Sequence, residues 1–547
     1  MFDKGSRRHY RRPTGAEPDY VSPPGLPLIG PIFPRRYMKK TPIRSRSTRT
    51  IPDRYFSTAH LSKQLKVRAV RGWTATFIGQ ILAKAIHLSA IAVLARLLTP
   101  ADFGLVAMIA VVMGFVQLCK DLGLSTATIQ QETITHEQVS TLFWINIGLG
   151  ALLMVVTLML APVLAWFYDQ EQLLGLTMGF SVGLFISGLG VQHTALLQRQ
   201  MRLGVLAGLD VMGIFVGTAV GIIAALKGFA VWSLVFMELA QIVFRTIAVW
   251  YICSWRPGRP RRGVGVGRML GFGGNLTGFN LINYLATRLD TLLIGWYSGP
   301  ILLGYYSRAF GLLLAPLRQM NHPATNVAIP TLSRIVEQGD RYRRVYFRIL
   351  NQIVLVTVPM ITFLIATSDW VVRVVLGPQW EKAGELFWIL GFAGLIIPIL
   401  NTFGWLFITQ NRTGELLHLG LIDAVVKILS VVIGLFWGVI GVAVAVAIRY
   451  YLMLPVSLWM VCRRGPVRAN DYLPSFFLAA ALSAAVLGAV KAFRSTGWLA
   501  EPALGIAGSL AVTVMIAAAM GLLLPGGRAT IRDTIHSLST LFKRESI

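Results

Sequence analysis

The sequence predicts an all-α polytopic membrane protein with about 14 transmembrane helices. Of its 547 residues, 55% are apolar, and the mean hydropathy is +0.63. Uniformly apolar stretches of roughly 20 residues, the length that crosses about 30 Å of hydrocarbon, recur from Trp73 onward. Strands of a membrane barrel would alternate with period two, so we expect these stretches to be helices.

The two ends of the chain differ from this apolar middle. Residues 1–71 hold 17 Lys and Arg against 4 Asp and Glu, and no apolar stretch among them is long enough to span a bilayer. A basic arm can bind nucleic acid, but this composition favours a disordered cytoplasmic arm that lies against the anionic inner leaflet. Residues 526–547 are interpreted as a cytoplasmic tail.

An internal repeat organises the spans. Segment 76–104 matches segment 276–304 at an offset of 200, so that Pro100 and Gly104 coincide with Pro300 and Gly304. Later in the chain the offset becomes 213. We therefore predict two parallel six-helix repeats followed by two appended helices, as transporters are commonly built. The predicted parts are an N-terminal lobe at 72–254, a C-terminal lobe at 255–463 and the appended helices at 464–525.

The distribution of positive charge predicts the orientation. Five arginines lie in 256–268, five in 334–348 and three in 463–468, all between predicted spans on one side. Cytoplasmic loops carry such an excess of Lys and Arg. We therefore expect a bacterial inner-membrane protein with both termini in the cytoplasm.

Ionisable residues inside the predicted spans are mostly cationic. The cations are Lys84, Arg96, Arg245, Arg288, Arg308, Arg318, Lys427 and Arg449, and the acids are Asp210, Glu238, Asp290 and Asp423. Each ionised group at the bilayer centre costs about 2.5–3.5 kcal/mol on insertion scales, so such groups must face protein or water. A cavity with this surplus of cations attracts an anion such as a phosphate.

Two polar stripes occupy equivalent helices of the repeat. The first span places Gln80, Lys84 and His87 on one face, and the seventh places Asn280 and Tyr284 on one face with Arg288 and Asp290 beside it. We interpret the stripes as the lining of one cavity between the lobes. Polar packing between helices is the alternative.

Other charges in the spans have competing interpretations. Glu238 near the middle of the sixth span is a candidate proton carrier, whereas a buried pair with an arginine is the alternative. Asp423 and Lys427 stand four residues apart and can pair along one helix. Arg449 has no obvious partner on its own helix and is assigned to the cavity.

Several segments resemble a known family. They are LARLLTPADFGLVAM at 94–108, DLGLSTATIQ at 121–130, GLGVQHTALLQRQM at 188–201 and RLDTLLIGWYSGPILLGYYSRAFGLLLAPL at 288–317. They resemble the Wzx-type flippases of polysaccharide and lipopolysaccharide biosynthesis, in the colanic-acid exporter branch of the multidrug/oligosaccharidyl-lipid/polysaccharide superfamily. The resemblance implies two lobes around a central cavity. It also implies transport of undecaprenyl-pyrophosphate-linked oligosaccharide by alternating access, driven by a proton or sodium gradient.

The leading hypothesis is therefore a flippase and not an enzyme. Cations and aromatic residues of the cavity would bind the pyrophosphate and the sugars: Lys84, His87, Asn280, Tyr284, Arg288, Tyr305, Tyr306, Arg308 and Arg449. Glu238 or Asp290 would couple transport to an ion. A small-molecule antiporter related to the MATE transporters is the alternative, and a membrane glycosyltransferase or polymerase is less favoured.

The expected partners follow from that hypothesis. They are the lipid-linked substrate, membrane lipids, and a polysaccharide polymerase and glycosyltransferases, with no nucleic acid. Cys119, Cys253 and Cys462 lack the spacing of a metal site, and no phosphate-binding GxxxxGK[ST] motif is present. Neither a metal nor a cofactor is expected.

Overall fold

The fold was analysed in a computed structural model. The structure describes residues 56, 65–121, 125, 128–129, 131, 134–261, 267–497 and 501–523, with the side chains of 65–73, 121, 267–283, 285–287 and 322 left out. Most of the predicted arm at 1–71 and nearly all of the predicted tail at 526–547 lie outside these residues. The described part contains helices and no strand.

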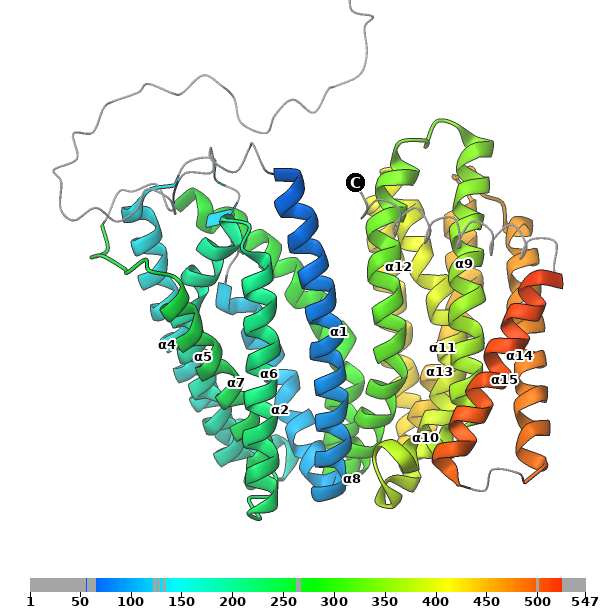
Figure 1. Ribbon diagram of the computed structural model, residues 1–547, viewed down its shortest axis with the longest axis horizontal. Helices are drawn as coiled ribbons and strands as arrows, with labels where there is room; N and C mark the ends of the chain where they lie inside the picture. Colours follow the sequence, from blue (N-terminus) through cyan, green and yellow to red (C-terminus); the bar gives the residue numbers. More distant parts are fainter. Residues whose placement is uncertain are drawn as a thin grey trace, which may run out of the picture. The chain divides into compact units, whose positions relative to one another are not determined.

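The helices follow one another with short connections (Figure 1). Their bounds are α1 Leu65–Leu97, α2 Pro100–Asp121, α4 His136–Tyr168, α5 Gln172–Arg199, α6 Leu203–Leu226, α7 Trp232–Ile252, α8 Gly267–Ser333, α9 Gly339–Ala366, α10 Ser368–Val375, α11 Glu381–Thr409, α12 Thr413–Leu435, α13 Gly438–Cys462, α14 Leu473–Ser495 and α15 Pro502–Leu523.

Thirteen of the described helices are long and apolar enough to cross a membrane. One of them, α8, contains 67 residues and is broken at Gly299, whose φ of 76° and ψ of −179° are not helical. A straight helix of that length would measure about 100 Å, three times the hydrocarbon thickness. Because Gly299 reverses the chain, α8 supplies two crossings, and the prediction of about 14 transmembrane helices is confirmed.

The helices form two bundles and an appended pair. In the first bundle, α4 packs on α5, α6 on α7, and α1 on α6. In the second, α11 packs on α8, α9 and α13, and α12 packs on α13, while α14 and α15 lie against α9. We call these bundles the N-terminal and C-terminal lobes; Figure 1 shows them with α8 between.

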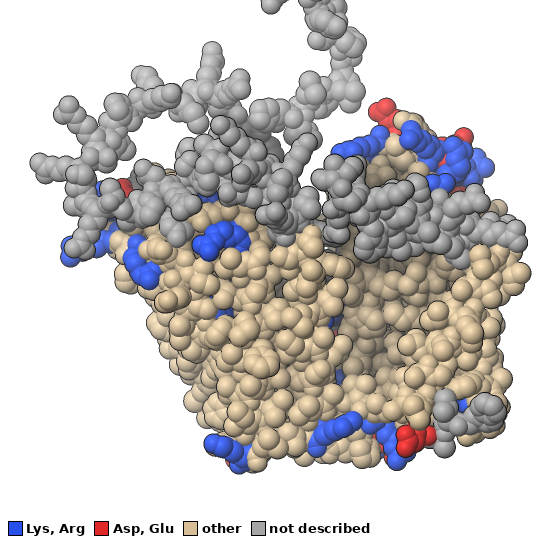
Figure 2. Space-filling model, viewed as in Figure 1, with Lys and Arg blue, Asp and Glu red and all other residues tan. Residues whose placement is uncertain are grey.

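The outer surface of the helices carries a broad apolar band. Figure 2 shows this band nearly free of charge across the middle, with Lys and Arg concentrated at its two edges. Aromatic residues near the helix ends are among the most exposed side chains, including Trp166, Tyr251 and Trp437. This arrangement is typical of lipid-facing surfaces with aromatic belts at the two interfaces.

The two repeats touch each other reciprocally. A methyl group added at Gly104 of α2 would lie 1.7 Å from the carbonyl oxygen of Pro300, and one added at Gly304 would lie 1.9 Å from that of Pro100. Residue pairs that exchange roles in this way indicate a two-fold relation. The axis of the repeat therefore passes between the start of α2 and the second half of α8, where glycine permits close packing.

Candidate functional site

The lobes are closed against each other at the end that contains the α1–α2 turn. One continuous core of buried residues crosses from lobe to lobe there and includes Leu94, Phe103, Leu303 and Trp380. Because this core is continuous between the lobes, this end of the junction is packed and leaves no passage for a substrate in this conformation. The charge distribution predicts that this end faces outward.

Polar contacts strengthen the same closure. The indole nitrogen of Trp380 donates to the carbonyl oxygen of Ala95 at 2.8 Å, and the guanidinium of Arg96 donates to that of Val374 at 2.6 Å. In the other repeat, Tyr168 packs on Gly295, the counterpart of Ala95 at the offset of 200. The end of the third helix of the N-terminal lobe and the segment after the third helix of the C-terminal lobe therefore each cover the first helix of the opposite lobe.

A group of cations lies behind this closure, where the lobes meet. His87 of α1 is within electrostatic range of Lys84 on its own helix and of Arg308 of α8. The guanidinium of Arg308 stacks 4.8 Å from the ring centre of Phe103. Within the described part of the chain neither Lys84 nor Arg308 has an acidic partner. The structure thus brings together three predicted site residues from two lobes. We call Lys84 and Arg308 the junction cations, and His87 lies near both.

Tyr284 and Arg288 extend this region along α8. The Tyr284 hydroxyl donates to the carbonyl oxygen of Ala110 at 3.0 Å, and it occupies the space that a side chain at Gly114 would fill. Arg288 lies 5.8 Å from the centre of the Tyr284 ring and is exposed. No carboxylate of the described residues pairs with Arg288. The predicted stripe on this helix therefore reaches α2 of the other lobe, while the side chain of Asn280 lies outside the described residues.

A second set of predicted residues forms a neutral network inside the C-terminal lobe. Asp290 is 4% exposed, accepts a hydrogen bond from the Tyr306 hydroxyl at 3.2 Å, and lies 3.4 Å from the amine of Lys427. Arg449 pairs with Asp423 and stacks on Tyr450. The sequence favoured pairing of Asp423 with Lys427 along α12, but both side chains reach partners on other helices.

The remaining candidates lie apart from the junction cations. Glu238 of α7 is half-buried, with Lys120 of α2 in electrostatic range. Tyr305 is half-buried at the closed end, where its ring meets that of Trp380 edge-on at 5.8 Å. Tyr306 is buried, so its ring offers no free surface in this conformation. The roles of these residues stay predictions.

Three residues of the junction were not anticipated. Phe103 supports Arg308, Gln379 donates to the carbonyl oxygens of Ala95 and Leu98, and Trp380 closes the outer end. Phe103 and Trp380 are apolar residues in apolar surroundings, and no pattern distinguished them. A group of three His, Cys, Asp or Glu side chains able to hold a metal is absent from the described residues.

Comparison with known proteins identifies the family. Residues 93–385, more than half of the chain, match the family described as polysaccharide biosynthesis protein. The chain belongs to this family. It is 23% identical over 411 residues to the lipopolysaccharide biosynthesis protein WzxC of Escherichia coli, covering 75% of this chain and 83% of that protein.

Other members and solved structures agree. The chain is 27% identical over 300 residues to the teichuronic acid biosynthesis protein TuaB of Bacillus subtilis. This match covers 54% of this chain and 62% of TuaB. The lipid II flippase MurJ in an inward closed conformation superposes with a TM-score of 0.65 at 14% identity, covering 85% of this chain and all of that one. An inward-facing MATE multidrug transporter superposes with a TM-score of 0.55 at 14% identity, and the match covers 70% of this chain and 94% of the transporter. The fold is thus that of MurJ and the MATE transporters.

Proposed function

We propose that the protein flips lipid-linked oligosaccharide, carried on undecaprenyl pyrophosphate, across the inner membrane for export of a polysaccharide or lipopolysaccharide. The observation that carries the proposal is the set of cations at the lobe junction that no described carboxylate neutralises. Membership of the polysaccharide biosynthesis family and the name of the relative WzxC support the same class of substrate.

The pyrophosphate of such a lipid carries charge that matches these cations. Lys84, Arg288 and Arg308 would bind it, because guanidinium groups donate two parallel hydrogen bonds to phosphate oxygens. Phe103 and Tyr284 hold the two arginines by stacking, so less side-chain freedom is lost on binding. An unpaired arginine in hydrocarbon is costly, which favours a water-filled or ligand-filled surrounding here.

The network around Asp290 is the site we propose for ion coupling. Asp290 is neutralised by Lys427 in this conformation. A proton or sodium ion that reaches Asp290 would replace the amine as its counter-charge and release Lys427. Because Asp290 lies two residues from Arg288 on α8, this exchange would alter the helix that carries a phosphate ligand.

The experiment is transport of fluorescent lipid-linked oligosaccharide in proteoliposomes. We expect Lys84→Ala, Arg288→Ala and Arg308→Ala each to reduce flipping at least tenfold, and Lys227→Ala, which removes an exposed cation at the end of α6, to leave it unchanged. Wild-type flipping in the double variant Lys84→Ala/Arg288→Ala would contradict the site. Transport of organic cations without lipid flipping would favour the antiporter instead.

Location and partners are part of the same proposal. We propose inner-membrane insertion with both termini in the cytoplasm, checked by reporter fusions at the α1–α2 turn and after α15. A polysaccharide polymerase and glycosyltransferases are the proposed partners, since one consumes and the others supply the transported lipid. Cross-linking in cells that carry the whole assembly tests that association.

A further inference from the structure

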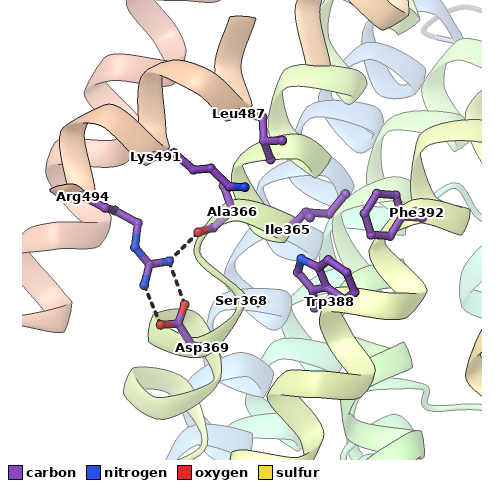
Figure 3. A pocket seen from close by; sticks show the side chains of 9 residues that line it. All are labelled: Ile365, Ala366, Ser368, Asp369, Trp388, Phe392, Leu487, Lys491 and Arg494. Carbon is purple, nitrogen blue, oxygen red and sulfur yellow. Dashed lines mark hydrogen bonds and ion pairs between the residues drawn. The ribbon is translucent and has the colours of Figure 1, made fainter. Parts of the chain in front are cut away.

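A cavity at the closed end of the C-terminal lobe is not used by the function proposed above. Its volume is about 360 Å³, and it lies where the ends of α9 and α14 meet α10 and the start of α11 (Figure 3). Its walls include Asp369, Lys491 and Arg494 on one side and Trp388 and Phe392 on the other. The cavity therefore joins a charged rim to an aromatic wall.

The rim carries one positive charge that is not neutralised. Arg494 forms a double ion pair with Asp369, at 2.9 Å and 2.7 Å, and also donates to the carbonyl oxygen of Ala366 at 2.6 Å. Stacking on Trp370 at 4.1 Å fixes its guanidinium further. Lys491, one turn earlier on α14, has no ion-pair partner among the described residues. Figure 3 shows its amine directed into the cavity.

The aromatic wall is typical of a surface near the lipid headgroups. Trp388 is 49% and Phe392 is 38% exposed, and they lie about two and about three turns from the start of α11. Exposed aromatic side chains near a helix end mark the interface between headgroups and acyl chains. An anionic headgroup at the rim would leave its glycerol and upper acyl carbons against this wall.

We propose that this cavity binds the phosphate of an anionic phospholipid of the outer leaflet. Lys491 supplies the counter-charge, Arg494 and Asp369 hold the rim in place, and Trp388 and Phe392 contact the apolar part. Basic pockets between transmembrane helices bind anionic headgroups in this way. Since α14 belongs to the appended pair and α11 to the lobe, the bound lipid bridges the two. The inference does not depend on the transported substrate, and its assignment to the outer leaflet rests on the orientation proposed above.

The test is retention of phosphatidylglycerol by the purified full-length protein, followed by native mass spectrometry. Removal of one interfacial cation corresponds to about a fivefold loss of lipid binding. We expect that loss for Lys491→Ala, none for the matched control Lys227→Ala, and recovery in Lys491→Arg. Phosphatidylcholine is expected to bind at least fivefold more weakly than phosphatidylglycerol.

Two further measurements separate the possible occupants. Trp388→Ala retains Lys491, and we expect it to lower lipid retention without changing the thermal unfolding midpoint in detergent by more than a few degrees. Inorganic phosphate at millimolar concentration should not displace the lipid. Equal retention in Lys491→Ala and the wild type, equal binding of phosphatidylcholine, or displacement by inorganic phosphate would each overturn the proposal.

Discussion

Gly104 lies where α2 passes against the backbone of Pro300, and a methyl group there has no space. The built Cβ is 1.7 Å from the Pro300 oxygen, whereas ordinary contact begins at 3.4 Å. The backbones would therefore separate by about 3.4 − 1.7 = 1.7 Å in Gly104→Ala. Backbone atoms cannot rotate away as a long side chain can, so the lobes themselves must move.

The cost of this separation sets the expected effect. Overpacking of a well-packed core costs typically about 1–3 kcal/mol. If the strain is released by opening the outer end, the closed conformation loses population by about 5- to 150-fold relative to the open one. Gly304→Ala introduces the reciprocal clash, with the carbonyl oxygen of Pro100, and should act in the same direction.

The assay is the distance between the lobes, measured by pulsed electron paramagnetic resonance. Spin labels are attached at Lys227→Cys and Lys382→Cys after the native cysteines have been replaced. We expect a longer distance in Gly104→Ala and no change in Gly148→Ala, because a methyl group at Gly148 meets nothing within 4 Å. An unchanged distance in a stably folded Gly104→Ala protein would refute the closure as described.

Three further substitutions test contacts of the described residues. Lys427→Met leaves Asp290 buried without a counter-charge and should destabilise the protein by about 3–5 kcal/mol; thermal unfolding in detergent should show partial recovery in Asp290→Asn/Lys427→Met. Arg199→Gln removes donors to four backbone carbonyls, including that of Phe56, so protease cleavage before α1 should accelerate, unlike in a variant of the exposed Arg202. Trp380→Phe loses one hydrogen bond across the lobes, worth about 0.5–1.5 kcal/mol, and should broaden the spin-label distances without abolishing the closed population.

Much of the fold follows from the sequence because its determinants are local. A stretch of apolar residues is either long enough to span a bilayer or it is not, and the offset of 200 identified equivalent turns at Pro100 and Pro300. The same offset could not show that Gly104 touches Pro300. An internal repeat states which residues are equivalent, whereas the position of the symmetry axis depends on how the copies pack.

The candidate site divides in the same way. The stripe that holds Lys84 and His87 was visible because both lie on one helix. Arg308 could not be placed beside them from the sequence, because it lies more than 200 residues later in the chain and only the packing of the two lobes brings it there. For the same reason, spacing suggested that Lys427 pairs within its helix, whereas its partner Asp290 lies on another.

The buried pair of Asp290 and Lys427 distinguishes two lobes that otherwise share a shape. At the repeat offsets, Asp290 corresponds to Ala90 and Lys427 to Ile214, so the N-terminal lobe has apolar residues where the C-terminal lobe has an ion pair. A change in the charge of Asp290 would act on one lobe alone. The C-terminal lobe would therefore respond first, before the N-terminal lobe. The direction of a transport cycle would be set by this ion pair, which the N-terminal copy of the repeat lacks.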